Sequence, residues 1–166
     1  MIGAIKSVLE RPLVLWGLFL SFAGLTIGFA LWIPHLGGEI LDAYTEAGAR
    51  RVMDQMTEAQ RISHGWMTLL LDMAYPLVYG LLSVGLAYKA FGTKGTLLAM
   101  PGWVVMPLDL SENIIEILAL WDVVDLLALK NYITPMKNVI FVVAMIIALV
   151  AAIVIAVRKV RNSNAG

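Results

Sequence analysis

Four polar side chains stand within one apolar stretch of the chain, "MPLDLSENIIEIL", residues 106–118. They are spaced i, i+3, i+4 and i+7, so a helix would place them on one face about 100° wide; they are Asp109, Glu112, Asn113 and Glu116. Carboxylates gathered on one face can hold a cation, or act as acid and base when their pKa values differ. The spacing therefore predicts a polar site along one side of a helix.

A second polar stripe lies at residues 65–88 and contains Asp72, Tyr75 and Tyr79 at near-helical spacing. Pro76 follows Asp72 by four residues, and its missing N–H leaves the Asp72 carbonyl without its helical donor. At 1.5 Å per residue, Asp72 and Asp109 lie at similar depths, roughly 10 and 12 Å below the outer surface of a bilayer. We expect the two stripes to face each other across one cavity.

Composition places both stripes inside a membrane. Hydrophobic residues make up 60% of the 166-residue chain and charged residues 14%, with a mean hydropathy of +0.84, which is far from the balance of a soluble domain. Such a chain has room for about four spans of roughly 20 residues. We expect an all-α integral membrane four-helix bundle, a single transmembrane domain over residues 1–166, with spans at about 12–33, 65–88, 97–121 and 135–157.

The polar stretch between the first two spans, residues 35–64, repeats its apolar residues at near-helical spacing. It is therefore expected to form one or two amphipathic helices on the bundle mouth or the membrane surface. His35 and His64 flank it, and either could cap the acidic cluster, although a solvated loop histidine is the more ordinary interpretation. The sequence contains no cysteine, which excludes disulfides and thiol chemistry.

The basic residues predict the orientation. Seven fall on one side of the predicted membrane and five on the other: Lys6, Arg11, Lys89, Lys94, Arg158, Lys159 and Arg161 against Arg50, Arg51, Arg61, Lys130 and Lys137. Because the side richer in lysine and arginine stays inside, both termini should be cytoplasmic. The formal net charge of zero argues against nucleic acid as a partner.

The acids of the two stripes need compensation. A carboxylate at the centre of a span costs roughly 2.5 to 3.5 kcal/mol, so Asp72, Asp109 and Glu112 should face the interior rather than lipid. The interiors of residues 65–88 and 97–121 hold no lysine or arginine. We therefore expect at least one of these acids to be protonated, or a cation from outside the chain to lie among them.

The last span, with "FVVAMIIALVAAIVIAV" free of polar residues, is predicted to be the outer, lipid-facing helix.

Two functions fit these features. The first is a pocket within the membrane, open to the outer side, for a small lipid-like or cationic ligand; its predicted ligand-binding residues are Asp72, Tyr75, Tyr79, Asp109, Glu112, Asn113 and Glu116. The second is a structural or accessory subunit of a larger membrane complex, or a homo-oligomer, in which buried acids meet a partner. Asn113 alone could be helix glue, and Glu116 could be interfacial. The pattern names no cofactor, leaves catalysis open, and lacks the Glu-x-x-His pairs of di-iron bundles, so no metal site is assigned.

Two linked patterns, "TEAQRISHGWMTLLLDMAYPLVYG" and "PLDLSEN", resemble a group of uncharacterised bacterial four-span membrane proteins. In that group an acid precedes an aromatic-Pro-x-x-Tyr-Gly element, and D-x-x-E-N follows one span later. The resemblance covers about half of the chain and implies a multi-pass protein of the bacterial inner membrane. More remotely, four spans with carboxylates in a bundle pocket are similar in architecture to the EXPERA group, although no motif of that group is matched.

Overall fold

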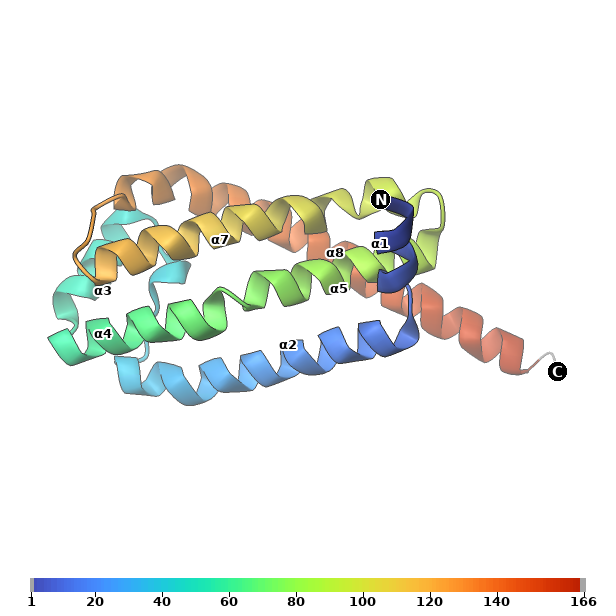
Figure 1. Ribbon diagram of the computed structural model, residues 1–166, viewed down its shortest axis with the longest axis horizontal. Helices are drawn as coiled ribbons and strands as arrows, with labels where there is room; N and C mark the ends of the chain where they lie inside the picture. The colour runs from blue at the N-terminus through green and yellow to red at the C-terminus, as the bar shows by residue number, and fades with distance from the viewer. Residues whose placement is uncertain (1, 165–166) are drawn as a thin grey trace.

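The computed structural model describes residues 2–164 of the protein and is built of helices alone within that range (Figure 1). The α-helices are α1 (Ile2–Leu9), α2 (Pro12–Trp32), α3 (Glu46–Gln55), α4 (Glu58–Met67), α5 (Tyr75–Phe91), α6 (Gly95–Leu98), α7 (Met100–Leu120) and α8 (Lys130–Ser163). Four short turns join them: η1 (Ile33–Leu36), η2 (Leu41–Ala43), the π-helical η3 (Thr68–Asp72) and η4 (Leu127–Leu129).

Three helical segments of the described chain are long and apolar enough to cross a membrane: Pro12–Leu36, Glu58–Phe91 and Leu127–Ser163. The second combines α4, η3 and α5, and both the second and the third start earlier than the predicted spans. The third predicted span, residues 97–121, corresponds to α7, which has 21 residues but carries three carboxylates. The all-α prediction is confirmed, whereas a membrane crossing by α7 stays a prediction.

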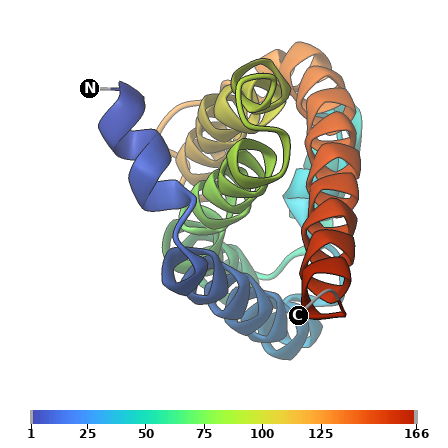
Figure 2. The ribbon, with the colours of Figure 1, turned by 90° about the vertical axis from the view of Figure 1, so that its right-hand side faces the viewer.

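Helix α5 is the centre of the bundle, because it packs against α2, α7 and α8. Figure 1 shows α5 between α7 and α2, and Figure 2 shows α8 facing them along the bundle. Helices α5 and α7 approach closely at Gly80 and Gly102, where a Cβ atom on either glycine would lie 3.1 Å from the carbonyl oxygen of the other. This close approach brings the polar faces of the two helices within hydrogen-bonding reach.

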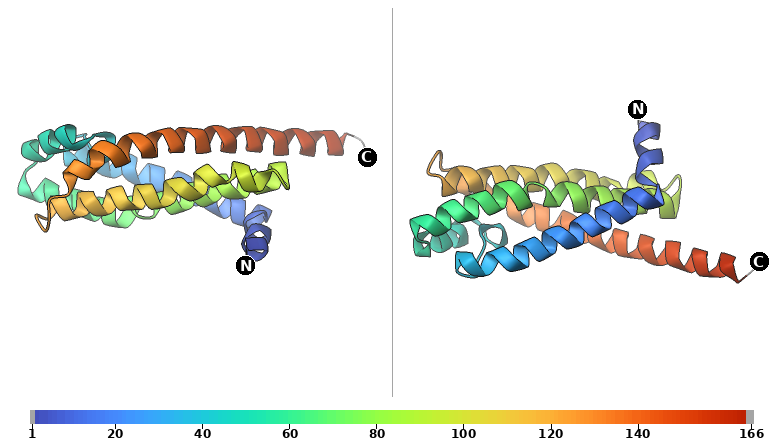
Figure 3. Two further views of the ribbon diagram at one scale, coloured as in Figure 1. Left: turned by 90° about the horizontal axis from the view of Figure 1, so that it is seen from above. Right: turned by 60° about the horizontal axis from the view of Figure 1, so that its bottom comes forward.

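Helix α3 covers the mouth of the bundle, in agreement with the amphipathic pattern. Its buried face, which includes Ala49, Val52 and Met53, packs against the end of α7 at Ile115 and Ala119. The chain reaches α3 through Gly37 and Gly38, with φ angles of 94° and 89°, which glycine adopts without steric cost. Figure 3 shows α3 and the start of α4 gathered at one end, while α8 extends beyond the other.

Helix α8 begins earlier than the predicted last span, and its first turns face inward, which the prediction of a lipid-facing helix did not include. The helix begins at Lys130, and its first two turns bury Lys130, Thr134 and Lys137 inside the bundle. Farther along, side chains such as Val139 and Ile146 are more than half exposed, as a lipid-facing surface requires. One helix therefore combines a polar, inward-facing start with an apolar, outward-facing remainder.

Candidate functional site

The candidate site begins at an irregularity in the helical segment that carries Asp72. The segment forms a π turn, in which the Met73 amide donates to the Thr68 carbonyl at 2.9 Å. Pro76 has no N–H to donate to the Asp72 carbonyl. Instead, the Asn113 side-chain amide on α7 donates to that carbonyl at 2.7 Å. The free acceptor expected from the sequence is thus satisfied across the helix interface.

The two polar stripes meet at a second buried hydrogen bond. The Tyr79 hydroxyl on α5 donates to Asp109 Oδ2 on α7 at 2.6 Å. Both side chains are buried, with exposed fractions of 2% for Tyr79 and 6% for Asp109. Since a hydrogen bond to a carboxylate is roughly twice as strong as one between neutral groups, this contact orients Asp109.

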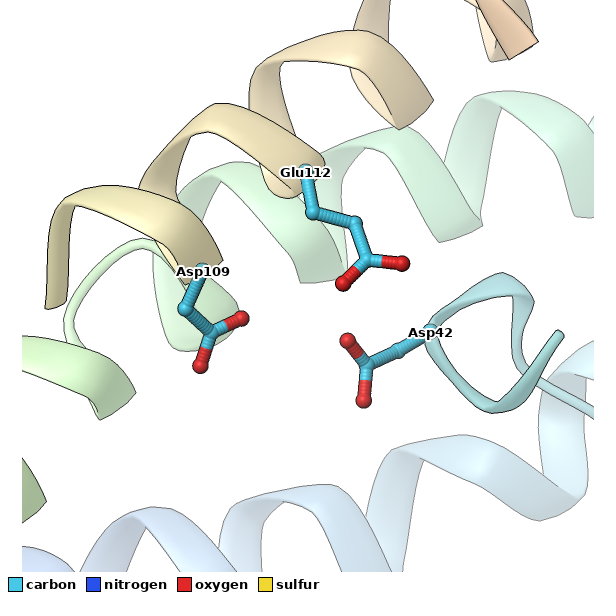
Figure 4. Close-up of side chains that lie close together, drawn as sticks. All are labelled: Asp42, Asp109 and Glu112. Carbon is cyan, nitrogen blue, oxygen red and sulfur yellow. The ribbon is translucent and has the colours of Figure 1, made fainter. Parts of the chain in front are cut away.

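Lys137 overturns the expectation that the acids have no basic partner in the chain. Its ammonium group contacts three carboxylates: it lies 2.7 Å from Glu112 Oε2 and 3.4 Å from Asp109 Oδ1, and it also pairs with Asp42. Figure 4 shows these carboxylates, from α7 and from the loop before α3, pointing toward one another. One oxygen from each lies within 4.8 Å of the others. Such a triad could hold a hard cation, but here the lysine supplies the positive charge.

Lys130 supplies a second ammonium group to the same cluster. Its Nζ atom lies 2.6 Å from Glu112 Oε1, pairs with Glu116, and donates to the Leu41 carbonyl at 3.1 Å. All three charged side chains are fully buried. Glu116 thus faces the interior of the bundle rather than its surface. The contact with Leu41 also fastens the loop before α3 to the bundle.

Four contributors to this cluster were missed from the sequence: Asp42, Lys130, Thr134 and Lys137. The spacing of the last three is i, i+4 and i+7, which places them on one helix face. The predicted span starts at about Pro135, which divides these residues between a loop and the helix. The hydroxyl of Thr134 donates to Glu112. A helix start five residues earlier would have revealed the stripe.

The cluster holds more acids than bases. Five carboxyl groups, those of Asp42, Asp72, Asp109, Glu112 and Glu116, stand with two ammonium groups. The described residues 2–164 provide neither an ion pair nor a hydrogen bond to the Asp72 carboxyl group, which is 8% exposed. An excess of buried negative charge requires protons or a cation. The expectation of protonation or cation binding thus remains, even though two lysines are present.

Asp72 lines a cavity of about 260 Å³. Its walls come from α2, the loop before α3, η3, α5, α7 and α8, and they combine acids with aromatic rings. Among the lining residues are Phe29, Asp42, Asp72, Tyr75, Tyr79, Asp109, Lys137 and Phe141. Tyr75 packs between Phe22, Phe29 and Tyr79, with ring centroids 5.2 to 5.5 Å apart. The structure thus places Asp72, Tyr75, Tyr79 and Asp109 on one cavity, whereas Glu112, Asn113 and Glu116 lie outside its lining.

The face between α4 and α7 contains further buried polar atoms. His64 is 1% exposed, so the interpretation of this residue as a solvated loop histidine was wrong, while His35 is exposed. Within the described chain, His64 Nδ1, Thr68 Oγ1, Asn113 Oδ1 and Glu116 Oε2 lack a hydrogen-bond partner. Such groups in a protein interior are commonly satisfied by ordered water.

A pair of charges on the surface joins α3 to the loop between α7 and η4. Arg50 on α3 donates to Asp125 Oδ2 at 2.8 Å, and the Leu127 amide donates to Asp125 Oδ1 at 3.1 Å. The hydrogen bond from Arg50, followed by that from the Leu127 amide, lowers the pKa of Asp125 below its ordinary value. The same pair raises the pKa of Arg50. Both groups are exposed, so this contact positions the loops more than it stabilises the fold.

Comparisons with protein-family models, with curated proteins and with solved structures find no match for this chain. The resemblance drawn from the sequence patterns stays a prediction, and the site must be interpreted from its own geometry.

Proposed function

We propose that this protein is a multi-pass membrane protein whose bundle binds a small, lipid-like ligand with a cationic group. The observation that carries the proposal is the Asp72 carboxyl group, which lines the cavity without a partner in the described chain. Ionisable groups inside a membrane are costly and typically functional. A ligand cation beside Asp72 would offset part of the excess negative charge.

The walls of the cavity favour an organic cation over a bare metal ion. Phe29, Tyr75, Tyr79 and Phe141 present aromatic surface to the same space, and aromatic faces attract ammonium groups that have lost their water. The best set of metal ligands, the carboxylates around Lys137, already surrounds an ammonium group. At about 30 Å³ per water molecule, the cavity has room for roughly nine waters or a small ligand group.

The proposed route of entry is from the outer side, between α2 and α8. Thr26 of α2 and Asn138 of α8 both line the cavity, and Thr26 is exposed. An apolar part of the ligand would extend between these helices toward lipid, and the loop carrying Asp42 would cover the mouth. Binding alone accounts for these features, and no reaction is proposed.

Mass spectrometry of small molecules retained by the gently solubilised protein tests the proposal. We expect an amine-containing compound in extracts of the wild type and its loss from Asp72→Asn, because the substitution removes the charge and keeps the shape. Asp54→Asn, at an exposed position on α3, is the matched control and should retain the compound. Equal retention by all three proteins, or no retained amine in the wild type, would contradict the proposal.

The accessory-subunit alternative has less support. It requires a partner's basic residue to satisfy the buried acids, yet Lys130 and Lys137 already pair with four of the five. Obligate co-purification of a second chain whose lysine or arginine cross-links near Asp72 would favour this alternative instead.

A further inference from the structure

A separate apolar groove lies at the end of the bundle that carries the chain termini. It has a volume of about 410 Å³ and runs between α2, α5 and α8. Its apolar walls include Leu15, Phe19, Leu82, Leu86 and Ile155, and Lys89 is the one charged residue in its lining. The groove therefore joins a long apolar surface to a single cation.

The groove runs along the helices, with its cation at one end. Leu82, Leu86 and Lys89 are spaced i, i+4 and i+7 on α5, so they lie on one face. The distance from Leu82 to Lys89 along the axis is about 10 Å, roughly a third of the hydrocarbon core of a bilayer. This direction and length suit one part of a lipid acyl chain with its headgroup beside Lys89.

Lys89 is available for an external anion. It is half-buried, and within residues 2–164 it forms neither an ion pair nor a hydrogen bond. A second cation lies at the same end of α5, because Arg158 Nη1 donates to the carbonyl of Ala90, the residue after Lys89, at 2.7 Å. A cation in the lining of an apolar groove, with a second cation at the same end of the helix, suits the phosphate of a phospholipid.

The surrounding charge excludes other occupants on electrostatic grounds. This end of the chain carries seven basic residues, and Glu10 is its one acid, 3.9 Å from Lys6. A second copy of the protein placed with the same end here would therefore bring like charges together. A neutral lipid would leave the partly buried ammonium group of Lys89 uncompensated.

We propose that this groove binds an anionic phospholipid, with its phosphate at Lys89 and Arg158 and one acyl chain along α5. The inference rests on the membrane embedding in the proposed function, and it is independent of the cavity at Asp72. The proposal places the end with the termini in a leaflet that contains anionic lipid. The orientation predicted from the basic residues places this end in the same leaflet.

Native mass spectrometry of the full chain with added lipid tests this site. Phosphatidylglycerol and phosphatidylcholine with identical acyl chains are titrated into the detergent-solubilised protein. We expect the wild type to bind phosphatidylglycerol more tightly than phosphatidylcholine. Lys89→Gln and Arg158→Gln should each bind phosphatidylglycerol about fivefold more weakly than the wild type does, because one basic residue near an anionic lipid contributes about that factor. Binding of phosphatidylcholine should weaken less, because its own ammonium group balances the charge of its phosphate.

Two further variants separate the groove from general charge. Lys94→Gln removes an exposed cation at the same end of the bundle and should leave the preference for phosphatidylglycerol intact. Ala152→Phe fills the groove and should reduce binding of both lipids; Ala156→Phe serves if the first variant is not monodisperse. Equal binding of the two lipids by the wild type, or equal effects of Lys89→Gln and Lys94→Gln, would overturn the proposal. Asp72→Asn should bind phosphatidylglycerol as tightly as the wild type does. The lipid titration therefore tests the groove independently of the amine-binding cavity at Asp72.

Discussion

Lys137 is the residue on which the balance of charge in the acidic cluster depends. Its ammonium group is shared by Asp42, Asp109 and Glu112 and is nearly inaccessible to solvent. We expect Lys137→Met to lower the free energy of unfolding by about 3 to 5 kcal/mol, because breaking a buried ion pair leaves an uncompensated charge. Thermal or denaturant unfolding in detergent measures the loss.

A second substitution checks the cause of that loss. Adding Glu112→Gln to Lys137→Met removes one of the charges left behind, so the double variant should recover part of the lost stability. Lys94→Met, at an exposed position, is the control and should change the stability by less than about 0.5 kcal/mol. Wild-type stability in Lys137→Met would show that the cluster does not need this ammonium group.

At the surface, Asp125 offers a prediction about pH. Arg50 lowers the pKa of Asp125 in the folded protein below its ordinary value of 3.8. The stability that the ionised Asp125 contributes is therefore complete above pH 3.8 and is lost as the pH falls through the lower pKa of the folded protein. Arg50→Gln should raise the pKa of Asp125 toward 3.8, which titration of the Asp125 carboxyl carbon by NMR can follow. Arg51→Gln, one residue along α3, should leave it unchanged. An unaltered titration in Arg50→Gln would place the cause elsewhere.

At the scale of elements, the π turn η3 in the second helical segment is joined to α7 by a hydrogen bond. Asn113 donates to the Asp72 carbonyl that Pro76 leaves free. We expect Asn113→Leu to cost about 1 to 3 kcal/mol, because a buried carbonyl loses its donor. In a Pro76→Ala background the cost should fall, since the substituted residue has an N–H that can donate to the same carbonyl. A double-mutant cycle of unfolding free energies measures the coupling, and strictly additive effects would contradict it.

The same elements explain which features could be predicted from the sequence. The spacing at Asp109 to Glu116 and the proline after Asp72 depend on helical periodicity alone, so the two facing stripes could be derived without a structure. Lys130 and Lys137 could not be placed in this way, because lysine usually marks the end of a membrane segment and Pro135 usually marks the start of a helix. The contribution of Asp42 depends on how a loop of many residues folds back, which local spacing does not determine.

For the whole molecule, the position of the two termini restricts the topology. Lys6, near the start of the described chain, donates to the Gly92 carbonyl, and Arg158, near its end, donates to that of Ala90. Helix α1 and the later part of α8 therefore contact the end of α5 and the connection that follows it, and Figure 1 shows the last turns of α8 extending beyond this point. An even number of membrane crossings follows if this arrangement is embedded in a bilayer.

The buried lysines also sharpen the orientation predicted from charge. The end with the termini carries seven basic residues, and the other end carries five. Two of those five, Lys130 and Lys137, are buried and paired with carboxylates. The other three, Arg50, Arg51 and Arg61, lie nearer the surface, and each of them also contacts a carboxylate. The difference between the ends is therefore larger than the sequence count indicates, and it favours cytoplasmic termini.

Reporter fusions at four positions test this topology. Fusions at the two ends and at the exposed Lys94 should report the cytoplasm, while a fusion at the exposed Val123 should report the opposite side, because α7 would lie between Lys94 and Val123. Equal signals from Lys94 and Val123 would mean that α7 does not cross the membrane, so its three carboxylates would lie in a re-entrant or peripheral helix. External signals from both termini, with a cytoplasmic signal from Val123, would keep the bundle but invert it. That result would place the acidic cavity toward the cytoplasm and the basic groove in the outer leaflet.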